Sequence, residues 1–107
     1  MYLVDYSVST PEVEVVVSDI TSIEDNYYTS FLDVYYPDGH HQSGWLDFNI
    51  YNGIFTPSYG LYEDAIYDPD DEEIESLPEH LQNIDIEPLV EKLVDDILPE
   101  LKEFHNA

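Results

Sequence analysis

Residues 45–56 of the chain read WLDFNIYNGIFT. Apolar and polar residues alternate through the first seven positions, which is typical of a half-buried β-strand. Asn52 and Gly53 follow, and this pair is the strongest hairpin signal in the sequence because both residues tolerate the positive φ of a type I′ turn. Residues 54–56 are expected to return as a short strand. Pro57 limits that strand to an edge or an end of a sheet.

The same alternation appears upstream of this hairpin. It predicts strands over residues 2–8, 12–18 and 28–36, so that residues 45–51 form the fourth strand. Pro11 separates the first two strands. The remaining segments are less regular: residues 19–27 read as a polar connection, residues 37–44 as a loop with a turn, and residues 58–67 as either a helical turn or an irregular strand.

Residues 86–105 show the clearest helical pattern. Apolar residues recur there at intervals of three and four, namely Ile86, Leu89, Val90, Leu93, Ile97, Leu101 and Phe104. Asp85 can act as the N-cap, and Pro88 is tolerated in the first turn. Pro99 should kink or end the helix near Leu98, since it removes a hydrogen bond and clashes with the preceding turn.

These elements predict a single α+β domain over residues 1–107, in which an antiparallel sheet of four or five strands packs a C-terminal amphipathic helix on one face. The helix is expected to cover Leu32, Val34, Leu46, Phe48 and Ile50. The opposite face would then show Asp5, Glu12, Glu14, Phe31, Asp33, Tyr35, Trp45, Asp47 and Tyr51. Mixed aromatic and acidic residues suit a protein interface. The alternatives are a second core layer formed with residues 58–70, or a homodimer surface.

Charge is the most unusual property of the sequence. It contains 25 Asp and Glu against two Lys and no Arg, which gives a formal net charge of −23. Sixteen of these acids lie in residues 61–107. A chain with so few cations has almost nothing with which to bind a phosphate backbone, so we expect no direct binding to nucleic acid or to an anionic membrane. The expected partner is a basic nucleic-acid-binding protein.

Twelve of the sixteen acids in residues 61–107 are the candidate partner-binding residues. They are Glu63, Asp64, Asp68, Asp70, Asp71, Glu72, Glu73, Glu75, Glu79, Glu87, Glu91 and Asp95. The last three are spaced by four residues, which places them on one helix face about 6 Å apart. Like charges at this spacing destabilise a helix. They do, however, resemble the regular charges of a nucleic-acid backbone; the alternative is an ordinary solvated face.

Metal binding and catalysis find little support in the sequence. Counted as a calcium loop, Asp68, Asp70, Glu72 and Glu79 occupy ligand positions, but the turn position that requires Gly holds Glu73. The four His residues form no catalytic pattern beside a nucleophile, and there is no Cys. We therefore expect no metal site, no cofactor and no enzymatic activity.

Localisation is expected to be cytoplasmic. The N-terminus lacks the basic and apolar regions of a signal peptide, and no apolar run approaches the roughly 20 residues that span a bilayer.

In size and charge, the whole chain resembles the acidic DNA-mimic inhibitors of phages and mobile elements, which include antirestriction and anti-CRISPR proteins and inhibitors of DNA repair. These proteins share no motif, so no residue roles can be transferred. The resemblance implies an inhibitor that occupies the basic cleft of a DNA-acting protein, in the host cytoplasm if the chain is phage-encoded. Two alternatives rely on the same attraction between an acidic protein and a basic partner: an immunity protein that neutralises a basic nuclease toxin, and an acidic adaptor that binds a basic protein.

Overall fold

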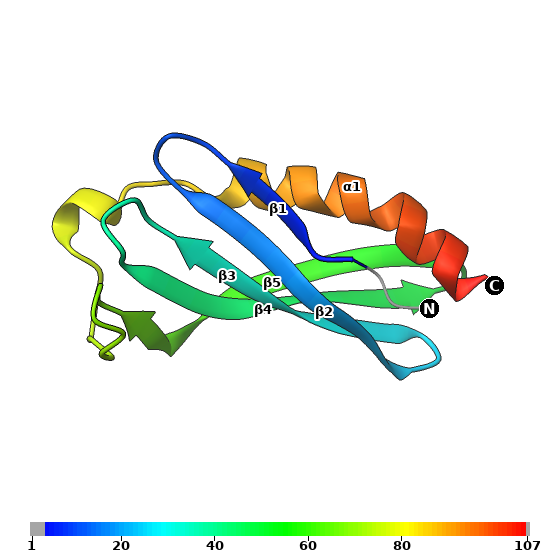
Figure 1. The fold of residues 1–107 in the computed structure, drawn as a ribbon. Helices are drawn as coiled ribbons and strands as arrows, with labels where there is room; N and C mark the ends of the chain where they lie inside the picture. The colour runs from blue at the N-terminus through cyan, green and yellow to red at the C-terminus, as the bar shows by residue number, and fades with distance from the viewer. Residues whose placement is uncertain (1–3, 107) are drawn as a thin grey trace.

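The protein, seen here as a computed structural model that describes residues 4–106, is a five-stranded antiparallel sheet with one long helix across it (Figure 1). The strands are β1 (Tyr6–Ser9), β2 (Glu14–Glu24), β3 (Tyr27–Tyr35), β4 (His41–Tyr51) and β5 (Ile54–Tyr67), followed by the short 3-10 helix η1 (Glu79–Leu81) and the helix α1 (Glu87–His105). Each strand pairs with its neighbour in the chain, in the order β1-β2-β3-β4-β5. The predicted α+β class is confirmed.

The β4–β5 hairpin forms where the sequence predicts it. Asn52 and Gly53 have φ values of 50° and 78°, as a type I′ turn requires. The strand that follows is longer than expected, because β5 continues through Pro57 as far as Tyr67. β5 is an edge strand, and an edge tolerates Pro because half of its N–H groups face no partner. The ambiguous residues 58–67 are therefore strand.

Three other boundaries differ from the predictions. β2 runs on to Glu24 through a register shift at Asp19, which has a φ of 54°, so most of the predicted 19–27 connection is strand. β4 begins at His41, three positions earlier than the predicted end of the loop at Gly44. The first strand is shorter than predicted and begins at Tyr6; residues 2 and 3 of that prediction lie outside the described residues.

α1 begins and ends close to the predicted positions, with two differences. Ile86 rather than Asp85 occupies the N-cap position, although the Asp85 carboxylate still accepts a hydrogen bond from the Glu87 N–H at 3.0 Å. Pro99 does not end the helix, which continues to His105. Pro99 is exposed, while Leu101 beyond it is fully buried. Packing of the last turns therefore outweighs the hydrogen bond that Pro99 removes.

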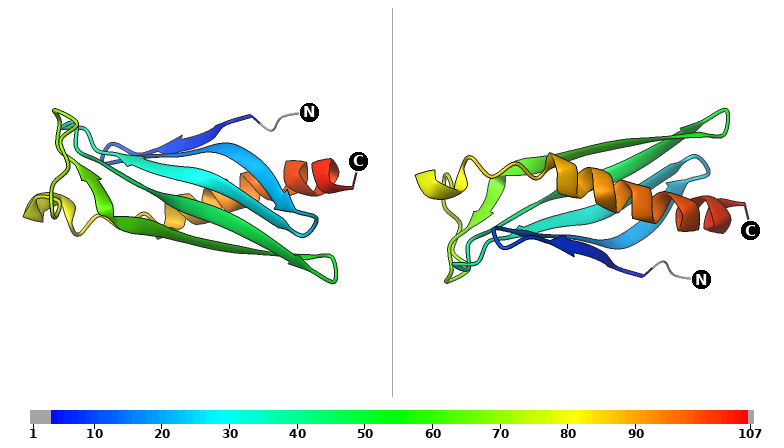
Figure 2. Two further views of the ribbon diagram at one scale, coloured as in Figure 1. Left: turned by 90° about the horizontal axis from the view of Figure 1, so that it is seen from below. Right: turned by 90° about the horizontal axis from the view of Figure 1, so that it is seen from above.

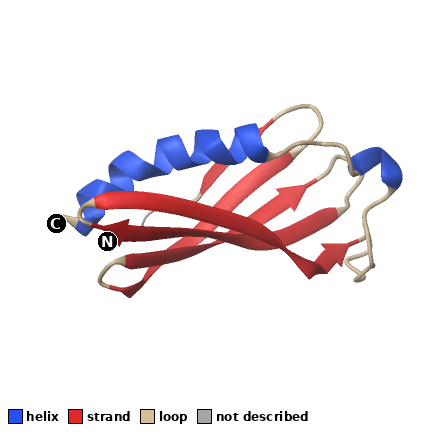
Figure 3. Cartoon of the chain, turned by 180° about the vertical axis from the view of Figure 1, so that it is seen from behind, coloured by secondary structure: helices blue, strands red, loops and turns tan. Residues whose placement is uncertain are grey.

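The core lies between α1 and one face of the sheet (Figures 2 and 3). It contains all five residues that the helix was expected to cover, and α1 contributes Val90, Leu93, Val94, Ile97 and Leu101. The alternative of a second core layer formed with residues 58–70 is wrong, because residues 58–67 extend the sheet instead of crossing its other face. On that open face Phe31 is 58% exposed.

Candidate functional site

The acids predicted on the helix form an exposed stripe. Glu87, Glu91 and Asp95 are all exposed on α1, and Glu91 and Asp95 line a shallow groove of about 300 Å³ between the helix and β5. Tyr59 of β5 lies in the same groove. Burial raises the pKa of Tyr59, and the nearby carboxylates, including Glu87 and Glu91, raise it further. The stripe thus projects a negative field over the β5 edge.

The two Lys residues of the chain do not neutralise this stripe. Lys92 pairs with Asp96 at 3.1 Å, and the Lys102 ammonium lies over the Phe55 ring at 5.8 Å from its centroid. On the opposite flank of α1, Glu100 accepts a hydrogen bond from the Tyr6 hydroxyl of β1. Burial raises the pKa of Tyr6, and this hydrogen bond to Glu100 raises it further. Asp96 and Glu100 are therefore engaged within the fold.

A second acidic group forms where the chain folds back along β5. The Ile74 N–H donates to the Ile66 carbonyl at 2.8 Å, which brings the acids on either side of the reversal together. Four predicted residues line one open hollow of about 400 Å³: Glu63, Asp64, Glu73 and Glu75. Nothing in the spacing of the sequence predicts this grouping, because it depends on that single tertiary pairing.

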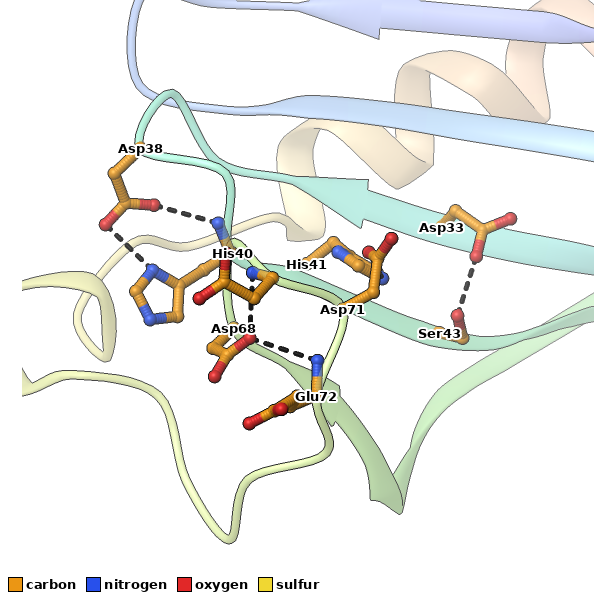
Figure 4. A network of polar contacts seen from close by, with 9 residues as sticks. Asp33, Asp38, His40, His41, Ser43, Asp68, Asp71 and Glu72 are labelled. Carbon is orange, nitrogen blue, oxygen red and sulfur yellow. Dashed lines mark hydrogen bonds and ion pairs between the residues drawn. The ribbon is translucent and has the colours of Figure 1, made fainter.

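The densest part of the acidic run is a self-contained turn. The Asp68 carboxylate accepts hydrogen bonds from the N–H groups of Asp70 at 2.8 Å and Glu72 at 3.0 Å (Figure 4). Asp71 has a φ of 63°, and its N–H donates to the Asp68 carbonyl. Asp68 therefore shapes the turn, while Asp70, Asp71 and Glu72 are exposed and the Asp71 carboxylate lies 3.6 Å from His41 Nε2. Glu79 lies apart from them, at the start of η1.

Asp38 organises the corner where the β3–β4 turn meets η1. Its carboxylate accepts a hydrogen bond from the His40 N–H at 3.0 Å and lies 2.9 Å from His40 Nδ1 and 3.5 Å from His80 Nε2. The hydrogen bond from the His40 backbone is the main reason that the pKa of Asp38 is lowered. His40 itself lies in the turn, but its side chain is largely covered.

The open face of the sheet carries alternating rows of aromatic and acidic side chains. Across β3, β4 and β5 the paired positions are, row by row, Tyr35–His41–Tyr67, Asp33–Ser43, Phe31–Trp45–Gly60 and Thr29–Asp47–Ser58. In the first row the His41 ring stacks on that of Tyr67, with centroids 4.8 Å apart, and lies tilted by 32° beside that of Tyr35, with centroids 5.9 Å apart. This face is larger than the sequence indicates.

The predicted composition of that face is mostly right. Glu14, Phe31, Asp33, Tyr35, Trp45, Asp47 and Tyr51 all lie on it. Glu12 instead lies in the β1–β2 turn, and Asp5 precedes β1. The missed members are His41, Tyr62 and Tyr67. Reading residues 58–67 as a strand would have placed Ser58, Gly60 and Tyr62 on this face, because alternate residues share a side.

Within residues 4–106, no group of three or more His, Asp or Glu side chains is arranged to hold a metal ion. No helix in this described part of the chain has the length and apolar character needed to cross a membrane. Comparisons of the chain with protein-family models, with curated proteins and with solved structures found no match.

Proposed function

We propose that this protein is a DNA-mimic inhibitor, which occupies the basic nucleic-acid-binding cleft of a DNA-acting host protein of the restriction, CRISPR or repair type. One observation carries the proposal: the density of charge along the molecule. The fold is elongated, with a longest dimension of 43 Å, and the chain carries a net charge of −23. A DNA duplex of that length would carry about 25 negative charges, at one per ~1.7 Å of axis.

The arrangement of the acids adds support. Secondary structure holds Glu87, Glu91 and Asp95 at fixed intervals of about 6 Å on α1. The second group, formed by Glu63, Asp64, Glu73 and Glu75, lies beside β5, the edge strand that also borders the groove next to the α1 stripe. A basic cleft would be attracted to this edge at long range, with an association rate that falls as salt rises.

The test is capture followed by competition. The immobilised protein is incubated with host lysate at low and at moderate salt, and the retained proteins are identified. Duplex DNA is then added to each purified partner complex. We expect the DNA to displace the partner, since both ligands occupy one cleft. A partner that binds this protein and DNA together contradicts the proposal and indicates an adaptor instead.

Two variants of equal charge locate the contact. One carries Glu87→Gln, Glu91→Gln and Asp95→Asn. The other carries Asp19→Asn at the register shift of β2, with Glu24→Gln and Asp25→Asn at the β2–β3 turn. Because both variants lose three charges, a general loss of attraction affects them equally. We expect the α1 variant to lose affinity roughly tenfold more than its control, since close charge pairs contribute on the order of 1.5 kcal/mol or more.

A further inference from the structure

The centre of the open face is an aromatic platform formed by Phe31, Trp45 and Tyr62. Trp45 of β4 pairs with Phe31 of β3 on one side and with Gly60 of β5 on the other. A Cβ added at Gly60 would lie 2.4 Å from Cη2 and 2.5 Å from Cζ2 of Trp45. The benzene part of the indole therefore lies directly against the Gly60 backbone. A side chain at residue 60 would collide with the indole, so Gly60 allows Trp45 to lie over β5, where the ring remains partly exposed.

Neighbouring rings extend this platform. Tyr62 packs beside Trp45, with ring centroids 5.1 Å apart and an angle of 43° between the ring planes. Phe31 is 58% exposed and Tyr62 49% exposed, although large apolar side chains are normally covered. A contiguous exposed aromatic surface of this kind marks an interaction site.

Carboxylates flank the platform on both sides. Asp47 lies two residues beyond Trp45 on the same strand, about 6.8 Å away along the backbone. Its two oxygens accept hydrogen bonds from the hydroxyls of Tyr27 and Thr29, each at 2.6 Å. Asp33, two residues beyond Phe31, accepts a hydrogen bond from the Ser43 hydroxyl at 2.7 Å (Figure 4). These bonds fix the direction of each carboxylate and leave it further acceptor sites.

We propose that this face is a second contact surface, beyond the acidic edge of α1 and β5, and that it binds arginine side chains of a basic protein partner; the inference rests on the proposed function for the positive charge of that partner. A guanidinium group is planar, so it can stack on the outer face of Trp45 or Phe31 while its N–H groups donate to Asp33 or Asp47. A Lys ammonium matches this combination less well, because it is a strongly hydrated point charge.

Charge argues for a basic partner and against a second copy of this chain. Glu14, Asp33 and Asp47 all lie on the open face, whereas both Lys residues of the sequence are in α1 on the other side of the sheet. Two such faces would bring six carboxylates together without a Lys or Arg between them. An arginine-rich surface supplies the opposite charge, and it fits rings as well as carboxylates.

The single Trp of the chain reports on this site directly. The full-length protein is titrated with a short peptide in which Arg alternates with Gly, and with a Lys peptide of equal length and charge, while Trp45 fluorescence is followed. We expect the Arg peptide to change the emission and to bind more tightly than the Lys peptide, by a factor of roughly 2–5 for each stacked ring. Equal affinities, or saturation without a change in emission, would overturn the proposal.

Paired variants separate the site from general charge. Asp33→Asn with Asp47→Asn should lower the affinity for the Arg peptide roughly fivefold or more relative to Asp19→Asn with Asp25→Asn, which removes the same charge elsewhere. Phe31→Ala provides a second test should the Asn variants unfold, because the Phe31 ring is largely exposed. This substitution should lower the affinity for the Arg peptide without affecting the affinity for the Lys peptide. Equal losses in the two Asn pairs would contradict the site.

Two further results complete the test. A dimer that buries Trp45, detected by light scattering with a blue shift of its emission at rising protein concentration, would overturn the proposal in favour of a homodimer face. The outcome also differs from that of the DNA competition. If partners remain bound in the presence of DNA while the Arg preference persists, the mimic function fails and the arginine site stands.

Discussion

An added Cβ at Gly60 would meet only the far end of the Trp45 side chain. An added Cβ at Gly44 would meet backbone, because it would lie 2.0 Å from the Gly60 carbonyl oxygen and 2.8 Å from Leu61 Cα. The two glycines therefore differ in what must move. A side chain can rotate away, but paired strands cannot separate without losing their ladder.

We expect Gly60→Ala to displace the indole from the sheet and red-shift its fluorescence, with a stability loss of about 1 kcal/mol, and Gly44→Ala to cost about 3 kcal/mol or more. Urea unfolding followed by far-UV circular dichroism measures both losses. An unshifted emission in Gly60→Ala would show that Trp45 is not held against residue 60.

Asp38 makes the stability of the folded protein depend on pH in the acidic range. Its pKa is lowered in the folded protein, chiefly by the hydrogen bond from the His40 N–H. A carboxyl group of this kind contributes stability above its ordinary pKa, near 4, and that contribution is lost as pH falls through the lower folded value.

Asp38→Asn should therefore destabilise the protein at pH 7 by roughly 1 kcal/mol. The loss is no larger because the carboxylate is partly exposed and its interactions are screened by water. Its difference from the wild type should narrow as pH falls below about 4 and vanish below the lowered pKa of Asp38, where both states bind the proton. Asp70→Asn is the matched control, since the Asp70 carboxylate takes part in no hydrogen bond or ion pair within residues 4–106. Unfolding in urea across this pH range checks both; a constant difference would contradict the assignment.

At the scale of the element, α1 contains two prolines whose replacement should affect stability differently. Pro88 lies in the first turn, where its missing N–H costs nothing, whereas Pro99 lies inside the helix and is exposed.

We expect Pro99→Ala to raise the free energy of unfolding by roughly 1–3 kcal/mol, because it restores a hydrogen bond and relieves a clash. Pro88→Ala should change it by less than about 1 kcal/mol. Chemical denaturation of the two variants measures the contrast. Equal effects would mean that the turns after Pro99 gain nothing from the repaired hydrogen bond.

α1 and the strands show which features can be predicted from the sequence and which cannot. Periodicity identifies the α1 face and the β3 and β4 faces, because burial on one side imposes a repeat of 3.6 or 2 residues. Pro57 predicts an edge strand, and β5 is one, although it is longer than expected. The break predicted at Pro99 does not occur, because packing of the last turns outweighs its local cost. The stripe from Glu87 to Asp95 follows from helix geometry alone. The hollow beside Glu63 depends on the pairing of Ile74 with Ile66, and no local pattern encodes such a contact.

At the scale of the whole molecule, the charge opposes the compact state. Most of the 25 acids lie on the surface, and the ion pairs within residues 4–106 involve few of them. Repulsion between them is screened by salt, since the Debye length falls from about 30 Å at 0.01 M to about 10 Å at 0.1 M.

The melting temperature should therefore rise by roughly 5–10 °C between these two salt concentrations, which corresponds to about 1–2 kcal/mol for a domain of this size. The variant with Glu87→Gln, Glu91→Gln and Asp95→Asn should melt higher at low salt and respond less to added salt. Differential scanning calorimetry measures both effects. A flat or falling response in the wild type would show that the charges are already compensated.

The sequential strand order has a consequence for synthesis on the ribosome. Each strand meets its partner as soon as the next hairpin emerges, so the sheet can assemble while the chain is still growing. α1 comes last, and until it arrives Leu46, Phe48 and their neighbours lie uncovered. During this interval, mutual repulsion between nascent chains can take the place of the missing helix. We expect a chain stopped at Ile84 to stay dispersed at low salt and to aggregate as salt rises, which light scattering would detect.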